Sequence, residues 1–197
     1  YAGGTTLALP PKPTAPSVLT ATAVSGNRIN LQWKDNSTNE AAFDVYRSAG
    51  TNANYVLIAS LAANNTTQAT YADTALFANA RYYYKITARN DGGSNTSNQV
   101  SATTLNNRPV MSALSDKSMR YGTQFTCNIS ATDPDGETLI FTASNLPAFA
   151  TLTDEGDGTA VLTFSPQSTD QGVWSNIQVK VSDQHSGVAT QSFTLTV

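Results

Sequence analysis

Residues 28–34 read Arg-Ile-Asn-Leu-Gln-Trp-Lys, and polar and apolar side chains alternate along them without a break. The same alternation recurs in residues 43–47 (Phe-Asp-Val-Tyr-Arg) and 82–88 (Tyr-Tyr-Tyr-Lys-Ile-Thr-Ala). A period of two sends one side chain into a core and the next into solvent, which is typical of half-buried β-strands. Each run is bounded by Asn, Gly, Ser or Asp, the residues that favour turns. About seven such strands in about ninety residues indicate a β-sandwich.

The second half of the chain repeats this pattern. Apolar side chains occupy alternate positions of four further runs, at residues 125–131, 139–143, 177–181 and 193–197. Turn sequences separate the strands, with Asp-Pro-Asp-Gly at residues 133–136 and Asp-Glu-Gly-Asp-Gly at 154–158. No stretch has the 3.6-residue period of an amphipathic helix. We therefore predict an all-β protein of two tandem immunoglobulin-like β-sandwiches.

Two polar, proline-containing stretches mark the expected boundaries. Prolines 10, 11, 13 and 16 lie close together and predict a stiff, extended spacer. Residues 1–13 are then a linker with the tail of a preceding domain, and residues 14–105 form the first sandwich. The short polar stretch at 105–109 follows a strand-like run, which starts the second sandwich at residue 106 and extends it to 197.

Composition narrows the class of function. The net charge is −3 over 197 residues and no basic stripe occurs, so nucleic acid is not an expected partner. No apolar run approaches the roughly 20 residues of a membrane span. A single cysteine, Cys127, cannot form an internal disulfide, which fits either a cytosolic protein or a bacterial secreted protein that avoids thiols. Few Lys and Glu with abundant Thr and Asn favour the second, so we expect a secreted or cell-surface location. The first residues show no signal peptide, and we interpret the chain as a piece of a larger protein.

Residues 14–105 resemble a fibronectin type III domain. The resemblance lies in Pro16-Ser17, in the core tryptophan of Leu31-Gln32-Trp33, and in residues 43–47 as the third strand. Leu76, followed six residues later by Tyr82, matches the family's tyrosine corner, whose hydroxyl ties a loop to the sandwich. No Arg-Gly-Asp occurs, so integrin binding through that tripeptide is not implied.

Residues 107–197 resemble a cadherin-like domain of the dystroglycan or "putative Ig" type found in bacterial surface proteins. The resemblance is carried by four stretches: 131–137 (Ala-Thr-Asp-Pro-Asp-Gly-Glu), 145–147 (Asn-Leu-Pro), 169–174 (Thr-Asp-Gln-Gly-Val-Trp) and 181–183 (Val-Ser-Asp). Several immunoglobulin-like families share these traits.

No catalytic set is visible. The only histidine, His185, lies in a polar turn and is expected to be solvated, and Cys127 lies mid-strand on an inward face as a core residue. The glutamates, Glu40, Glu137 and Glu155, do not pair with another acid in a way that suggests a glycosidase. We therefore predict that the chain is not an enzyme.

Calcium is the one metal that the sequence suggests. Asp133 and Asp135 are separated by one residue, so one turn can present both carboxylates to an ion that prefers oxygen ligands. The cadherin-like resemblance adds an acid at a later strand end and an Asn of the linker, which match Asp183 and Asn107. The rest of a cadherin site would come from the preceding domain, whose fibronectin-like sequence lacks the acidic motifs, so at most a single, weakly bound ion is expected. The alternative is that Asp-Pro-Asp-Gly is simply a turn.

Exposed aromatic side chains are the other candidate site. Trp33 is a core residue by position, and Trp174 is expected to be mostly buried. Alternation places Tyr46 and Tyr83 outward on neighbouring strands, where they can form a small patch for a sugar or a protein. The alternative is a cross-strand pair that stabilises the sheet.

These observations predict a non-catalytic, monomeric spacer and interaction module of a larger protein. Its partners would be neighbouring domains of the parent chain, and the parent would be an adhesin or a polysaccharide-degrading enzyme with this accessory region. The competing hypothesis is a module that binds a polysaccharide or a surface protein through Tyr46 and Tyr83.

Overall fold

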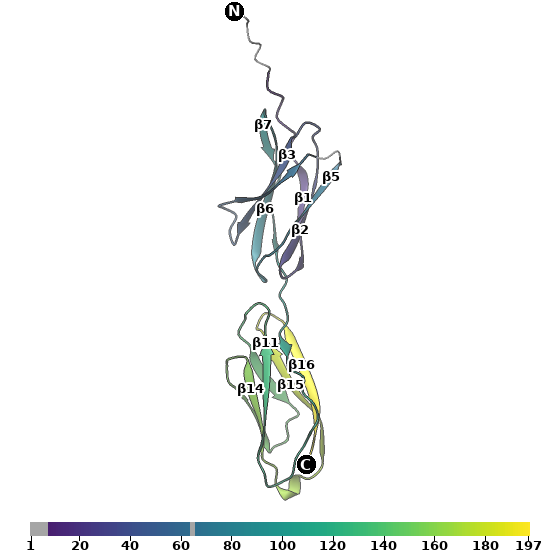
Figure 1. The fold of residues 1–197 in the computed structure, drawn as a ribbon, viewed down its shortest axis with the longest axis vertical. Helices are drawn as coiled ribbons and strands as arrows, with labels where there is room; N and C mark the ends of the chain where they lie inside the picture. The colour runs from purple at the N-terminus through teal and green to yellow at the C-terminus, as the bar shows by residue number, and fades with distance from the viewer. Residues whose placement is uncertain (1–7, 64–65) are drawn as a thin grey trace, which may run out of the picture. The chain divides into compact units, whose positions relative to one another are not determined.

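The structure is a computed structural model that describes residues 8–63 and 66–197. The chain divides into two compact units, Tyr1–Leu105 and Asn106–Val197, each with its own core. Both units are sandwiches of β-sheets, which confirms the predicted fold class (Figure 1). Within the described ranges, no helix has the length and apolar character that crossing a bilayer requires.

The first unit contains two sheets that face each other across a shared core (Figure 1). One sheet has the order β1-β2-β5, and the other has the order β4-β3-β6-β7 with β8 also paired to β6. All these pairings are antiparallel. The strands are β1 (Ser17–Ser25), β2 (Arg28–Lys34), β3 (Ala42–Ala49), β4 (Val56–Ala62), β5 (Gln68–Asp73), β6 (Arg81–Asn90), β7 (Gly93–Thr96) and β8 (Val100–Thr103).

Aromatic side chains from both sheets fill this core. Trp33 of β2 is fully buried and meets Phe43 of β3 edge-on, with 5.8 Å between ring centroids. The hydroxyl of Tyr82 accepts a hydrogen bond from the backbone N–H of Phe77 at 3.0 Å. That bond ties the β5–β6 loop to the sheet, as the tyrosine-corner resemblance implies.

The proline segment, residues 10–16, lies along the first unit. Pro13 and Pro16 are buried in it, while the intervening residues are more exposed. Four asparagine amides donate hydrogen bonds to backbone carbonyls of the segment: Asn39 and Asn90 to Pro11 (both 2.9 Å), Asn95 to Pro13 (2.8 Å) and Asn36 to Ala15 (2.9 Å). Proline lacks an N–H and interrupts a β-ladder, and these side-chain amides satisfy the carbonyls of Pro11, Pro13 and Ala15.

The second unit is built in the same way from sheets β10-β16-β15-β12 and β13-β14-β11-β9. Its pairings are antiparallel except β10 with β16, which is parallel. A single 3₁₀ turn, η1 (Ser168–Asp170), precedes β15. The strands are β9 (Val110–Met111), β10 (Lys117–Ser118), β11 (Phe125–Thr132), β12 (Ile140–Ser144), β13 (Ala150–Asp154), β14 (Thr159–Phe164), β15 (Val173–Ser182) and β16 (Val188–Thr196).

Apolar side chains at alternate positions of these strands form the second core. Phe164 of β14 is fully buried and meets Phe193 of β16 edge-on at 6.4 Å. Cys127 is half-buried and packs against the core. The expectation for Trp174 is wrong, because its side chain is 37% exposed. It lies over Phe149 at the end of the sandwich, at a centroid distance of 5.4 Å.

Candidate metal centre and surface sites

Three acidic side chains gather at the turn between β11 and β12. Asp133, Asp135 and Glu137 are each half-buried, and one carboxylate oxygen from each lies within 4.8 Å of the others. The turn brings them together through an Asx motif, in which Asp133 Oδ1 accepts a hydrogen bond from the backbone N–H of Asp135 at 2.7 Å. Gly136 completes the turn with a φ of 74°, a conformation that glycine adopts without strain.

Polar oxygen atoms without a partner lie at this turn and beside it. Oδ2 of Asp133 and Oε2 of Glu137 are shielded from solvent and accept no hydrogen bond, and the same holds for Oδ1 of Asn106. A buried oxygen with no donor loses its hydration without compensation, at a cost of about 1–3 kcal/mol. A cation that coordinates such oxygens would remove this cost, so the residues present fit a hard metal ion.

Asn107 holds Asp135 in place. Its backbone N–H donates to Asp135 Oδ2 at 2.8 Å, and its side-chain amide donates to Oδ1 at 2.7 Å. The amide nitrogen of Asn107 therefore faces the carboxylate, and its contribution is that of a donor that orients Asp135.

Asp183 organises the loop between β15 and β16. Its Oδ1 accepts the backbone N–H groups of His185 (2.7 Å) and Gly187 (2.9 Å), and its Oδ2 accepts the side-chain amide of Asn106 (2.7 Å). Burial raises the pKa of Asp183, but these hydrogen bonds outweigh it and hold the pKa below its usual value. A Cβ at Gly187 would lie 1.8 Å from Asp183 Oδ2, so only glycine fits against this carboxylate.

Glu137 connects the acidic turn to the β15–β16 loop. Its Oε1 lies 2.7 Å from Nδ1 of His185, while Oε2 is the unpartnered atom described above. Burial raises the pKa of Glu137; His185 opposes this, and repulsion from neighbouring carboxylates, including Asp133, adds to the rise. Uncompensated negative charge is therefore concentrated at the turn.

The four residues predicted from the sequence thus lie in one region with different environments. Asp133 has a free buried oxygen, Asp135 is capped by Asn107, and Asp183 has both oxygens in hydrogen bonds. The geometry adds Glu137 and Asn106, which the sequence reasoning did not assign to the site. The signal for Glu137 was its place in the alternation of acids at 133, 135 and 137.

The aromatic candidates lie on the sheet formed by β3 and β6. Tyr46 and Tyr83 are half-buried, and opposite them in the ladder are Lys85 and Ser48. Lys85 Nζ lies 5.5 Å from the ring centroid of Tyr46 and 4.5 Å from that of Tyr55.

Arg81 Cζ lies 5.3 Å from the centroid of the Tyr83 ring. Cation–π contacts with the protein's own side chains therefore occupy ring faces that a sugar would need.

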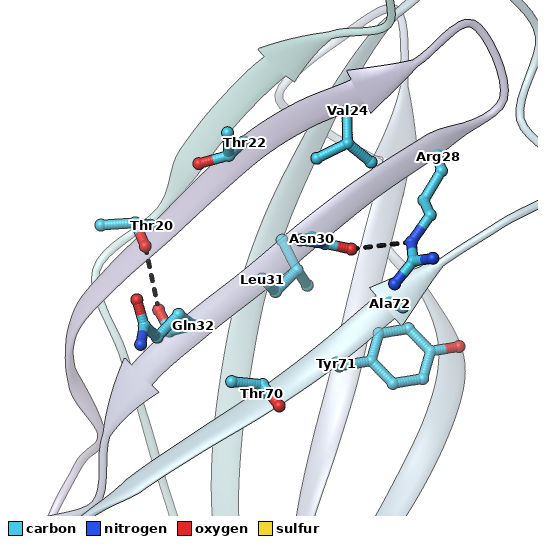
Figure 2. Close-up of a pocket in the computed structure, with 10 residues that line it drawn as sticks. All are labelled: Thr20, Thr22, Val24, Arg28, Asn30, Leu31, Gln32, Thr70, Tyr71 and Ala72. Atoms are coloured by element: carbon cyan, nitrogen blue, oxygen red, sulfur yellow. Dashed lines mark hydrogen bonds between the residues drawn. The ribbon is translucent and has the colours of Figure 1, made fainter.

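The outward face of β1-β2-β5 carries a shallow hollow of about 390 Å³ (Figure 2). Threonine and amide residues make up half of its lining, and its charged residue, Arg28, donates from Nε to Asn30 Oδ1 at 2.9 Å. Figure 2 shows this bond running along β2 and the ring of Tyr71 at the margin.

Residues 106–196 match the family described as bacterial Ig domain. The second unit is thus similar in sequence to bacterial immunoglobulin-like domains, and it has an immunoglobulin-like fold. The cadherin-like assignment stays a prediction. No protein of curated function matches the chain.

Among solved structures, similar chains include fibronectin type III domains. The structure called FN3tt is 21% identical, with 47% of this chain and 97% of that chain covered and a TM-score of 0.37. The sixth such domain of human fibronectin type III domain containing protein 3 is 16% identical, with 52% and 92% covered and a TM-score of 0.41. The endo-fucoidan hydrolase MfFcnA4 of glycoside hydrolase family 107 is 16% identical, with a TM-score of 0.41. There the match covers 95% of this chain but only 29% of the hydrolase. With sequence identities and TM-scores this low, neither a substrate nor an activity can be assigned to this chain from these structures.

Proposed function

We propose that the chain is a non-catalytic spacer and interaction module of a larger secreted or surface protein, and that calcium stiffens its second unit. The spacer role is supported by the proline segment, because four asparagine side chains hold its carbonyls against the first unit. A linker fixed in this way transmits orientation, whereas a flexible one does not.

The lack of a catalytic set among residues 8–63 and 66–197 supports the same proposal. His185 contacts Glu137 and the Asp183 loop, and no serine, threonine or cysteine side chain in those ranges hydrogen-bonds to it. A nucleophile and a base in contact are the minimum for covalent hydrolysis.

The calcium role is supported by the unpartnered oxygens of Asp133, Glu137 and Asn106. Calcium takes six to eight oxygen ligands in an adaptable geometry, and water molecules complete the set. Bound calcium would neutralise the repulsion at the turn between β11 and β12 and would thereby stabilise the folded second unit.

Thermal unfolding of the full chain tests the calcium role. When the free calcium concentration is about a hundred times the dissociation constant, binding adds about 2.7 kcal/mol to the free energy of unfolding. The melting temperature of the second unit should therefore rise by about 10–20 °C relative to chelator. Asp133→Ala and Glu137→Gln should both abolish the difference, whereas Glu155→Gln, in the exposed β13–β14 hairpin, should leave it intact. Identical melting curves with calcium and with chelator would refute the calcium role.

A distance measurement tests the spacer role. Spin labels at Leu9→Cys and Thr70→Cys, with Cys127→Ser to remove the native thiol, report the position of the proline segment relative to β5. Both labelled positions are exposed, so the labels should not disturb the core. A narrow distance distribution is expected, and a distribution as broad as that of a random coil would contradict a stiff attachment.

A further inference from the structure

The loop between β2 and β3, residues 35–41, begins and nearly ends with a buried acid. Asp35 is 8% exposed and Glu40 is 9% exposed. In the described part of the chain, no lysine, arginine or histidine forms an ion pair with either of them. Buried carboxylates normally have a cation or several hydrogen-bond donors nearby, so this pair requires an explanation.

Glu40 has the more unusual environment. Its side chain is about nine-tenths buried, and Oε2 is shielded from solvent with no hydrogen-bond donor. Asp35 accepts one hydrogen bond, from the backbone N–H of Ser37 to Oδ1 at 2.9 Å. Burial raises the pKa of Asp35, the Ser37 N–H opposes this, and repulsion from Glu40 adds to the rise.

Both acids line a hollow of about 650 Å³. Ser37, Thr38 and Thr67, which carry hydroxyl groups, line the same hollow. Lys34 also lines the hollow, but its side chain is exposed and forms no ion pair with either acid. Two carboxylates with neutral oxygens on a short loop form the ligand set of a hard divalent cation.

We propose that Asp35 and Glu40 bind a divalent cation, Ca²⁺, at the β2–β3 loop of the first unit. Calcium fits better than magnesium because the loop supplies ligands of several kinds, whereas magnesium demands a near-ideal octahedron. Glu40 Oε2 and the carboxylate of Asp35 are the charged ligands, and water fills the remaining positions.

This site would act on the proline segment. The same loop carries Asn36 and Asn39, whose amides donate to the carbonyls of Ala15 and Pro11. Asn36 and Asn39 lie between Asp35 and Glu40 in the sequence. An ion bound by both acids would therefore restrict the motion of the loop that holds the proline segment. The site is independent of the acidic turn in the second unit, so either one can fail without the other.

The test uses the ¹⁵N-labelled full chain with Asp133→Asn and Asp135→Asn, which removes the candidate site of the second unit. Calcium chloride is titrated while amide resonances of Ser37, Thr38 and Thr67 are followed, with magnesium chloride as a parallel titration. The shifts should saturate with calcium, and magnesium should bind at least tenfold more weakly. In the same background, Glu40→Gln should weaken calcium binding at least tenfold, and Asp91→Asn, an exposed acid of the first unit, should change nothing.

Two results would overturn the proposal. One is an absence of saturable calcium shifts in the loop, with the same resonances responding only to pH, which would identify a proton shared between the acids. The other is calcium binding that Glu40→Gln leaves unchanged. Because the spectrum also reports folding, Asp35→Asn replaces Glu40→Gln should the latter not fold.

Discussion

Gly92 lies in the turn between β6 and β7, where the proline segment passes. A Cβ built at this position would lie 1.7 Å from the backbone oxygen of Pro10 and 2.9 Å from its carbonyl carbon. These are backbone atoms, so no side-chain rotation relieves the overlap. Gly92→Ala should therefore displace the proline segment from the first unit.

The size of the effect follows from the contacts that the displacement breaks. A methyl group needs roughly 3.5 Å from a neighbouring heavy atom, so Pro10 must retreat by about 2 Å. The amides of Asn39 and Asn90 both reach Pro11 O at 2.9 Å and would lose it. Each bond contributes about 0.5–1.5 kcal/mol, and at an exposed site we expect a total loss of about 1–2 kcal/mol. For a domain of this size, that corresponds to a fall in melting temperature of about 5–10 °C.

Two measurements on the full chain check this prediction. Thermal unfolding gives the stability of the first unit, and the Leu9–Thr70 spin-label distance gives the freedom of the proline segment. Gly92→Ala should lower the melting temperature of the first unit and broaden the distribution of the Leu9–Thr70 distance. Asn39→Ala should cost less in the Gly92→Ala background than in the native sequence, because the same bond is already broken.

Gly50→Ala is the matched control. Its φ of 73° makes alanine strained, but an added Cβ would meet nothing within 4 Å. It should lower the melting temperature without broadening the distance distribution. A Gly92→Ala variant with the native distance distribution and melting temperature would refute the assigned contact between the turn and the segment.

Two further predictions concern the cores. Burial, followed by the hydrogen bond to Asp73 at 2.8 Å, raises the pKa of Tyr84 well above 10.0, so the folded chain keeps a proton that the unfolded chain loses in alkali. Above pH 10 the free energy of unfolding of the first unit should fall by up to about 1.4 kcal/mol per pH unit. Urea titrations at several pH values measure this slope, and Tyr84→Phe should flatten it. An unchanged slope in the variant would refute this explanation. Phe164→Ala should destabilise the second unit by about 3–5 kcal/mol in chemical denaturation, and a loss below 1 kcal/mol would mean that the core is assigned wrongly.

The fold class was predictable because alternation is a local property of the chain. In β2, the sequence pattern of residues 28–34 matches the burial pattern position by position, with Ile29, Leu31 and Trp33 all buried. This burial pattern follows from the local sequence alone, because successive side chains of a strand point to opposite faces. The same holds for Ile177, Val179 and Val181 in β15.

The burial of Trp174 was not predictable in the same way. β15 pairs regularly with β16 from Ile177 onward, but the register shifts between Trp174 and Ile177. Asn176 has a φ of 59° at this irregularity. An extra residue in a strand reverses the face of everything before it, and the alternation of apolar residues does not reveal where that happens.

The ligand environment depended on long-range hydrogen bonds that the sequence does not display. Asn106 and Asp183, which share a hydrogen bond, are 77 residues apart in the sequence, and Asn107 and Asp135 are 28 residues apart. The spacing of the motifs predicts that the acids lie on neighbouring loops, but it does not predict which of their oxygens lack a hydrogen-bond donor. Hydrogen-bond accounting separates a carboxylate that supports a loop from one that can take a metal.

That distinction predicts opposite effects for two similar substitutions in the second unit. Asp133→Asn keeps an Oδ1 acceptor for the Asp135 N–H and removes one charge from three crowded carboxylates, so in chelator it should raise the melting temperature. Asp183→Asn replaces an oxygen that accepts a hydrogen bond with an amide nitrogen, so in chelator it should lower the melting temperature. Added calcium should stabilise Asp183→Asn but not Asp133→Asn. If both variants are destabilised equally in chelator, then the acidic turn is held together by hydrogen bonds and carries no charge that calcium would relieve.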